Sequence, residues 1–285
     1  MSPPILEVVG LAHRYPGNQK DTLSGVSLKI TAGRRLAILG GNGSGKTTLF
    51  LLMNGTLRPR AGSIHLDGIP ARYDAQGLAR WRQEVGVVLQ ESDDQLFAAS
   101  IAEDVSFGPL NLGLSREETH ARVQASLQAL NLTELADRPP HHLSHGQRKR
   151  AAIAGILAMR PRLLVLDEPT AGLDGPGQRD LRHTLEELSR QYGTTIVFST
   201  HDIELAYTWA EEAAIFANGR ILAQGPVTSL LTDLPLLERA NLTPPAAVTL
   251  RNALAKIGVG VPPLVRSVGE LAEAIDRHDS MFSAI

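Results

Sequence analysis

The 285-residue chain contains no cysteine, which excludes disulfide bonds and thiolate metal sites. It also lacks an excess of charge: 28 Lys and Arg stand against 30 Asp and Glu, a formal net charge of −2. No dense basic tract favours a polynucleotide partner, so nucleic-acid binding is not expected. The one basic cluster, Arg148-Lys149-Arg150, is interpreted as serving nucleotide or dimer contacts.

Long apolar runs are missing as well. None approaches the roughly 20 residues that are needed to cross a bilayer. We therefore expect no transmembrane segment, and any membrane role has to come through a partner. The start, Met1-Ser2-Pro3-Pro4, shows neither the basic nor the apolar region of a signal peptide, which argues against export. These absences favour a cytoplasmic location, peripheral to a membrane if a membrane is involved.

Apolar residues make up 43% of the chain, which is typical of a packed globular protein. Short apolar runs alternate with segments of helical spacing, and this alternation predicts an α/β fold with a parallel sheet. The predicted strands of that sheet are residues 36–39, 163–166, 195–199, 213–216 and 221–223. Two further strands, residues 5–12 and 23–30, are predicted to pair antiparallel.

Two regions depart from this alternation. Residues 95–160 are predicted to be helical: Ser115 followed by Glu118 indicates a capping box, and a second helix is predicted after Gly146. From about Leu234, prolines separate short amphipathic segments. This tail is either a small accessory helical region or a loosely packed end. We place a cassette at residues 1–234 and a C-terminal extension at residues 235–285.

A glycine-rich loop follows the strand predicted at residues 36–39. Its glycines allow backbone N–H groups to converge on phosphate oxygens, and the helix predicted after it directs its positive end at them. We expect Lys46 to reach the β- and γ-phosphates and Thr47 to complete part of an Mg²⁺ shell. The loop consists of Gly40, Gly41, Asn42, Gly43, Ser44, Gly45, Lys46 and Thr47.

An acidic pair ends the strand predicted at residues 163–166. Asp167 lies at the carboxyl end of that strand, where α/β sheets bind their ligands, and is predicted to hold Mg²⁺ through water. Glu168 is the candidate for polarising the attacking water. Taken alone, an acidic strand end is more often simply solvated. Its register with the glycine-rich loop favours the catalytic interpretation.

A pentapeptide, residues 143–147 (Leu-Ser-His-Gly-Gln), lies between these two elements. The three motifs in this order resemble those of ATP-binding cassette (ABC) ATPases, and the resemblance extends over residues 1 to about 230. It implies an α/β cassette with a P-loop NTPase core sheet, an antiparallel β subdomain and a helical signature subdomain at about residues 95–160, followed by a small C-terminal helical extension. It also implies ATP and Mg²⁺ as cofactors, with ATP held between the two subunits of a homodimer.

The resemblance assigns roles to residues elsewhere. Tyr15 matches the aromatic residue that stacks on adenine, Gln90 matches the glutamine that senses Mg²⁺, and His201 matches the histidine that contacts the γ-phosphate. Each has an ordinary packing or solvation role when taken alone, but their order and spacing favour the family's roles. Residues 171–174 match the D-loop, the segment that crosses the dimer.

The implied site is therefore as follows. The catalytic residues are Lys46, Glu168 and His201. The metal residues are Thr47, Gln90 and Asp167. The nucleotide residues are Tyr15, Gly40, Asn42, Gly43, Ser44, Gly45, Lys46, Thr47, Thr48, Gln90, Ser144, Gly146, Gln147 and Asp174.

The signature departs from its commonest form in one position, because His145 stands where most members have glycine. Ser144, Gly146 and Gln147 are intact, so we expect the phosphate contacts to be kept. The ring of His145 is expected to point away from the γ-phosphate.

Residues 91–97 and 103–111 resemble the ATPases of energy-coupling-factor importers. The histidine in the signature, residues 152–159 and residues 241–245 resemble the cobalt transporter ATPase. The resemblance implies an ATPase that drives cobalt import at the cytoplasmic face of the membrane, with integral membrane subunits near Gln90.

Alternatives remain within and outside this group. A vitamin or nickel importer of the same type is one alternative, and a soluble non-transport ABC protein is another. The single cassette and the lack of sustained heptads disfavour the soluble protein. Regulatory ATP binding without turnover is disfavoured by the intact Glu168 and His201.

Overall fold

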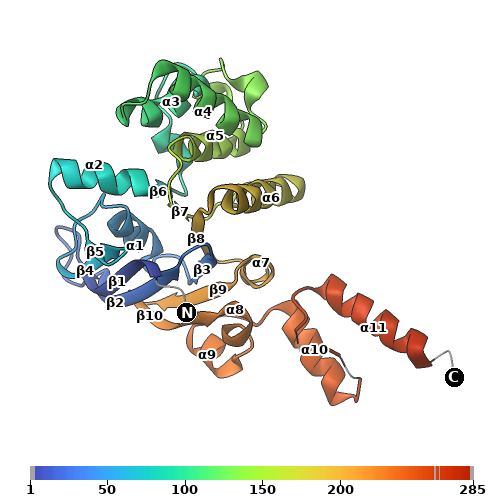
Figure 1. Cartoon of the computed structure of the whole chain (residues 1–285). Coiled ribbons are helices and arrows are strands. Elements are labelled where there is room, and N and C mark those ends of the chain that lie inside the picture. The colour runs from blue at the N-terminus through green and yellow to red at the C-terminus, as the bar shows by residue number, and fades with distance from the viewer. Residues whose placement is uncertain (1–3, 260, 263, 283–285) are drawn as a thin grey trace.

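The computed structural model describes residues 4–259, 261–262 and 264–282. The other residues, which include the first three of the start segment and Pro263 of the tail, lie outside the described residues. In the described part, an α/β core carries a helical subdomain at one end and a group of C-terminal helices at the other (Figure 1). None of the described helices combines the length and the apolar character that a membrane span requires.

A mostly parallel sheet forms the core, in the order β10-β9-β3-β8-β7-β6. The pairings from β9 to β6 are all parallel. Every residue of β7 and β8 is buried, as expected for strands covered on both faces. Its strands are β3 (Arg35–Leu39), β6 (Val85–Val88), β7 (Leu163–Leu166), β8 (Thr195–Thr200), β9 (Glu212–Ala217) and β10 (Arg220–Pro226).

The sequence predicted a parallel sheet that included residues 221–223, and this prediction is wrong for the edge strand β10. It pairs antiparallel with β9. The two strands are joined by Asn218 and Gly219, whose φ angles are 50° and 71°. Two consecutive residues with positive φ make the hairpin turn whose twist matches the flanking strands, and Asn-Gly is its preferred sequence.

The predicted antiparallel pair is confirmed and belongs to a second sheet, ordered β2-β1-β4-β5. This sheet packs beside the core sheet, with its buried residues and those of α1 (Lys46–Met53) in one hydrophobic cluster. Its strands are β1 (Pro4–His13), β2 (Leu23–Thr31), β4 (Ala61–Leu66) and β5 (Ile69–Pro70).

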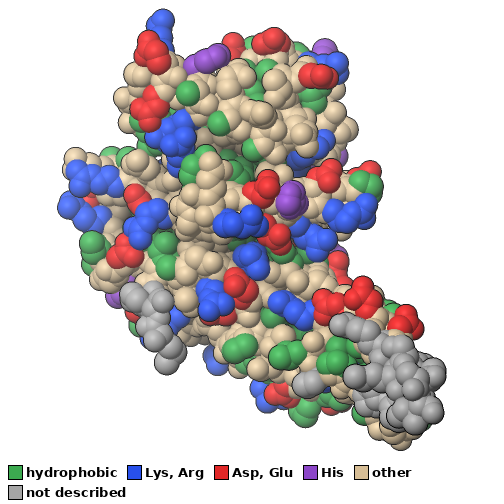
Figure 2. All heavy atoms as spheres, turned by 45° about the vertical axis from the view of Figure 1, so that its right-hand side comes forward, with side chains coloured by type: hydrophobic (Ala, Val, Ile, Leu, Met, Phe, Trp, Pro, Cys, Tyr) green, Lys and Arg blue, Asp and Glu red, His purple; other side chains and the backbone are tan. Residues whose placement is uncertain are grey.

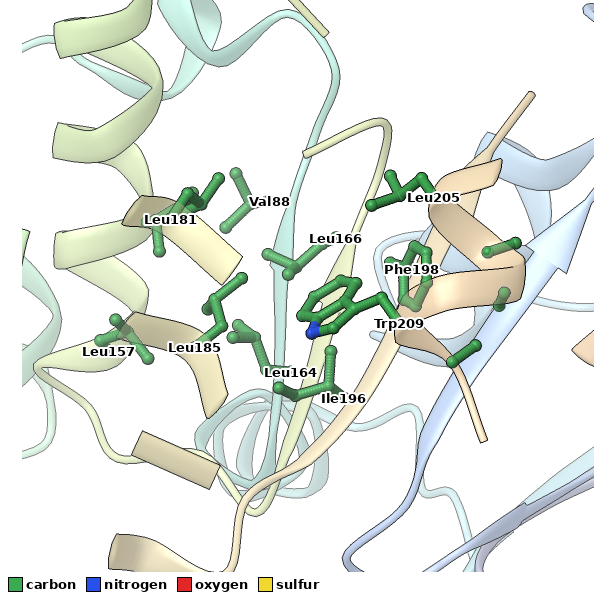
Figure 3. Close-up of a cluster of buried hydrophobic side chains, with 14 of the residues drawn as sticks. Val88, Leu157, Leu164, Leu166, Leu181, Leu185, Ile196, Phe198, Leu205 and Trp209 are labelled. Carbon is green, nitrogen blue, oxygen red and sulfur yellow. The ribbon is translucent and has the colours of Figure 1, made fainter. Parts of the chain in front are cut away.

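Two helices cover the other face of the core sheet, α6 (Gly175–Tyr192) and α7 (Ile203–Trp209). Leu181 and Leu185 of α6 point toward the strands, and the rings of Phe198 and Trp209 lie 4.5 Å apart, centroid to centroid (Figure 3). Burial of a large apolar side chain stabilises a fold by about 1.5–3 kcal/mol. This packing fixes the carboxyl ends of β7 and β8, from which the acidic pair and His201 follow.

The helical subdomain contains α3 (Ile101–Asn111), α4 (Arg116–Ala129) and α5 (His145–Leu157). Ser115 caps α4 by accepting from the N–H of Glu118 at 3.1 Å. The capping box predicted there is only half correct, because the Glu118 carboxylate pairs with Arg122 one turn later, at 2.7 Å. A complete capping box instead begins α5, the signature helix.

The described residues of the tail form helices that pack against the core. Of the two interpretations, the accessory helical region therefore fits the structure and the loosely packed end does not. Arg266 Nε donates to the carbonyl oxygen of Tyr207 at 2.8 Å, and the N–H of Ala246 donates to Glu204 at 2.5 Å, so both contacts are made to α7. Leu237 joins the main core. The boundary at residue 234 stays a prediction. The helices of the tail are α9 (Leu234–Arg239), α10 (Ala246–Lys256) and α11 (Val268–Phe282), and the short helix α8 (Val227–Leu230) precedes them.

Candidate active site

The glycine-rich loop lies between β3 and α1, where the sequence predicted it. Gly45 has a φ of 108°, which strongly favours glycine, and a Cβ built on Gly40 would lie 2.2 Å from the carbonyl oxygen of Phe216. Helix α1 begins directly after the loop, so its positive end faces it. The buried Ser44 hydroxyl has no partner among the described residues. The loop therefore offers polar donors suited to an anion.

Lys46 is buried and bends back over this loop. Its Nζ donates to the carbonyl oxygens of Gly40 at 2.8 Å and of Gly41 at 3.0 Å. Burial lowers the pKa of Lys46, and the nearby carboxylates of Glu168 and Asp167 partly oppose that shift. The ammonium is thus held at the mouth of the loop, where phosphate oxygens are stronger acceptors than the two carbonyls.

The side chain of Asp167 is fixed by two hydroxyl groups. Thr47 Oγ1 donates to one carboxylate oxygen at 2.5 Å, and Ser199 Oγ donates to the other at 2.5 Å. Asp167, Thr47 and Gln90 line the same pocket of about 300 Å³. These donors are all oxygens, the ligand type that Mg²⁺ takes in proteins, so the predicted metal residues fit the ion.

Glu168 has an unusual backbone. Its φ of 47° lies in the left-handed region, which costs an L-residue about 1–2 kcal/mol. Ser199 Oγ accepts from its N–H at 2.9 Å, and Lys149 Nζ donates to its carbonyl oxygen at 2.7 Å. This conformation brings the Glu168 carboxylate to 2.9 Å from His201 Nδ1. A shielded carboxylate and an exposed imidazole thus meet beside the loop.

Tyr15 lies beside the glycine-rich loop as well. Its hydroxyl is 3.2 Å from Oγ1 of Thr48 on α1, and the ring packs edge-on against His13. The structure therefore places Tyr15 beside the first turn of α1, directly after the loop, although Tyr15 lines neither of the two pockets at the loop.

The signature residues lie elsewhere. Ser144 Oγ accepts from the N–H of Gln147 at 3.3 Å, and the Gln147 side chain accepts from the N–H of Ser144 at 2.9 Å. Gly146 packs against Leu173, and Asp174 caps α6. Among the described residues, none of the signature lines either pocket at the glycine-rich loop. One chain therefore holds the two halves of the predicted nucleotide site apart.

His145 packs against the D-loop of its own chain. A Cβ built on Gly172 would lie 2.5 Å from His145 Cδ2 and 2.7 Å from Nε2. Gly172 also has a φ of 76°, which disfavours any side chain there. The ring thus occupies the space that glycine leaves open at position 172.

Sequence reasoning was wrong about Lys149. The residue was expected to serve nucleotide or dimer contacts, but it is 1% exposed and its ammonium bonds to backbone carbonyls inside the chain. The available signal was its position two residues beyond Gln147, the N3 residue of the capping box, on the inner face of the signature helix.

Two other features of the candidate site are not marked by any sequence motif. Ser199 holds both Asp167 and the backbone of Glu168, although it is only the fifth residue of a buried strand. A second pocket of about 500 Å³ lies on the other side of the loop, and part of its wall comes from the tail. These tail residues are Arg239, Ala240, Asn241, Leu242 and Thr243. Because these residues are far from the loop along the chain, the sequence did not indicate that both line one pocket.

The family model described as ABC transporter matches residues 23–171, which is more than half of the chain. The chain belongs to the ABC transporter ATPase family. It is an ATP-hydrolysing enzyme, and within the family it resembles the subunits of the energy-coupling-factor type. The cobalt import ATP-binding protein CbiO of Rhodobacter capsulatus is 51% identical over 247 residues, 87% of this chain and 88% of the relative. Other relatives are named energy-coupling factor transporter ATP-binding proteins.

Solved structures agree with this assignment. The CbiO1 protein of Clostridium perfringens, part of an ABC transporter complex, matches with a TM-score of 0.74 at 39% identity, covering 88% of this chain and all (100%) of that one. A dimeric ATP-binding cassette in a post-hydrolysis state, bound to ADP and Pi, matches with a TM-score of 0.71 at 27% identity, covering 78% and 98%. The predicted fold class is confirmed.

The contact between His145 and Gly172 leads to a prediction about two single variants and their combination. Gly172→Ala should lower the ATPase rate by about tenfold or more, because it adds both a clash and backbone strain of roughly 1–3 kcal/mol. Adding His145→Gly should restore part of the rate, since the clash disappears and the strain remains. His145→Gly alone should keep most of the activity. Steady-state rates of the three variants decide: a large loss in His145→Gly would show that the ring takes part in turnover.

Proposed function

We propose that the chain energises a membrane importer of the energy-coupling-factor type that takes up cobalt ions. The observation that carries the importer assignment is a groove beside the Q-loop, the loop that contains Gln90. Its walls include Phe97 of residues 91–97 and Phe107 of residues 103–111, the two stretches whose sequences resemble this type of importer. Cobalt as the substrate is supported by the similarity to the cobalt import ATP-binding protein CbiO.

The groove has a volume of about 670 Å³ and lies between the core and the helical subdomain. Phe97 and Phe107 are 66% and 50% exposed, and their rings meet edge-on with centroids 4.9 Å apart. The Gln95 side chain is held by two hydrogen bonds: it accepts from the N–H of Leu89 at 2.9 Å and donates to the carbonyl oxygen of Val87 at 3.1 Å. Exposed aromatic side chains at the edge of an apolar groove are suited to a helix of a partner protein.

Asp104 adds a polar acceptor to this groove. Its Oδ1 accepts from the N–H groups of Phe97 at 3.0 Å and Ala98 at 3.1 Å, which fixes the turn. Its Oδ2 is buried and has no partner among the described residues. A cationic or N–H donor side chain of the docked helix would satisfy this oxygen.

At the active site, each residue of the chain has a distinct proposed role. Lys46 neutralises the β- and γ-phosphates of ATP, Glu168 accepts a proton from the attacking water, and His201 contacts the γ-phosphate. Mg²⁺ would be held by Thr47, Asp167 and Gln90 of the Q-loop. When bound, the ion would neutralise charge on the phosphates. Tyr15 offers its ring to the adenine.

The separation of the signature from the loop within one chain supports a homodimer that closes around ATP. In such a dimer, the signature of one subunit completes the nucleotide site of the other through Ser144, Gly146 and Gln147. Asp174 lies near the interface between the two subunits. The tail offers further surface, because Ile257 and Leu264 are 74% and 69% exposed. Docking of membrane subunits in the groove would hold the dimer at the cytoplasmic face of the membrane.

Phe107→Asp tests the proposed docking groove. The charge should lower the yield of integral membrane subunits that co-purify from detergent-solubilised membranes by at least about tenfold, since buried charge opposes docking. ATPase activity of the isolated protein should stay near wild type. Ile69→Asp, at a residue that is 69% exposed on β5, is the matched control and should retain the subunits. Equal recovery with both variants would reject the groove.

The imported substrate is tested on the same purified complex. Metal analysis after incubation with cobalt and nickel salts should show cobalt retained in the membrane subunits. Retention of nickel alone would replace cobalt as the substrate, retention of no metal would favour the vitamin importer, and both results would leave the importer assignment standing. The absence of any integral membrane partner would favour the soluble ABC protein.

A further inference from the structure

A buried lysine lies beneath the active site. Lys149 is on α5, two residues after the signature, and is 1% exposed. Its Nζ donates to the carbonyl oxygen of Glu168 at 2.7 Å and to that of Ala171 at 3.4 Å. One side chain therefore links the helix of the signature to the segment that carries both the acidic pair and the D-loop.

The bond to Glu168 completes a backbone clamp. The N–H of Glu168 is held by Ser199 Oγ at 2.9 Å, and its carbonyl is held by Lys149. A non-glycine residue with a φ of 47° persists only where its surroundings over-determine the conformation. The backbone angles of Glu168 set the direction of its carboxylate, so the clamp also fixes the direction of the group that faces His201.

Packing alone does not explain a lysine at this position. An ammonium loses its hydration on burial, and an apolar side chain of similar volume is often equally or more stable there. Burial accordingly lowers the pKa of Lys149, with Glu168, Asp167 and Glu91 opposing the shift. What an apolar side chain cannot do is donate hydrogen bonds to the two carbonyl oxygens.

We propose that Lys149 is a positioning residue for hydrolysis: it holds the backbone of Glu168 so that the carboxylate is directed at the attacking water. The inference rests on the proposed role of Glu168. Lys149 is 1% exposed and its ammonium is already bonded to backbone carbonyls of its own chain, so it acts on the reaction through Glu168 and leaves the binding of ATP unchanged.

Lys149→Met tests this role, because methionine fills a similar volume without a donor. The kcat should fall by up to about 10²-fold, the effect of misplacing a catalytic group by roughly 1 Å. The KM for ATP should stay within about twofold, and Lys149→Gln, which keeps an N–H donor, should lose less. The melting temperature of Lys149→Met should not fall. Lys29→Met, at a lysine whose side chain is 69% exposed, is the control.

A lower melting temperature with an unchanged kcat per folded molecule would show a packing role and overturn the inference. So would a raised KM with an unchanged kcat, which would place Lys149 in nucleotide binding.

A double-mutant cycle with Glu168→Gln tests whether Lys149 acts through Glu168. In the Glu168→Gln background, Lys149→Met should cause no further loss in the single-turnover rate, because the group that it positions is already removed. Losses that multiply would overturn the inference. If Lys149→Met is unaffected and Glu168→Gln is inactive, only the inference on Lys149 fails. If Glu168→Gln hydrolyses ATP at the wild-type rate, the proposed catalytic role fails and the inference falls with it.

Discussion

Glu168→Gln is expected to bind ATP normally and to lose hydrolysis by about 10²- to 10⁴-fold, the contribution of a general base. The amide fills the same space but cannot accept a proton from water. Binding depends on the glycine-rich loop and Lys46, which the change does not touch. Because ATP then stays intact between the subunits, an ATP-dependent dimer should accumulate, visible by gel filtration with ATP and Mg²⁺.

Glu187→Gln is a matched control, since that carboxylate lies on α6 with a side chain that is 57% exposed. It should show wild-type rates and no accumulated dimer. Hydrolysis near the wild-type rate in Glu168→Gln would show that another group activates the water. His201, 2.9 Å from Glu168, would then be the next residue to test.

Lys46→Ala is expected to weaken ATP binding and turnover together. A hydrogen bond to a charged group contributes about 1.5–3 kcal/mol, which corresponds to roughly 10- to 100-fold in Kd. The loss extends to the transition state, because Lys46 also neutralises the charge on the transferred phosphoryl group. Equilibrium binding of a fluorescent ATP analogue and the steady-state ATPase rate measure the two effects.

The contrast between these variants is informative. Glu168→Gln should separate binding from turnover, whereas Lys46→Ala should lose both. Lys29→Ala, at an exposed lysine on β2, should change neither. Normal ATPase activity in Lys46→Ala would contradict the central assignment of the glycine-rich loop.

Local patterns were sufficient for much of the fold and the candidate site. Buried parallel strands are continuous apolar runs, so β3, β7 and β8 could be placed from the sequence. The position of Asp167 at a strand end follows from the same pattern. The turn at Asp67 and Gly68, which joins β4 and β5 with φ angles of 49° and 78°, has a sequence that favours such hairpins. These features depend on residues that are neighbours in the chain.

Mixed charge is a further property of composition. Figure 2 shows basic and acidic side chains interspersed over one face of the molecule, in keeping with the small net charge. The interspersed charges on this face form no continuous basic track.

The sequence by itself determined the order of motifs, the strand ends that bear the acidic pair, and the family that these identify. The tertiary structure decided which distant groups meet. Lys149 reaches Glu168 across two subdomains, and Ser199 clamps both acidic residues from a neighbouring strand. The reason is physical: periodicity records which face of an element is buried, whereas the partner of a buried polar group depends on how separate elements pack. That information lies in the fold.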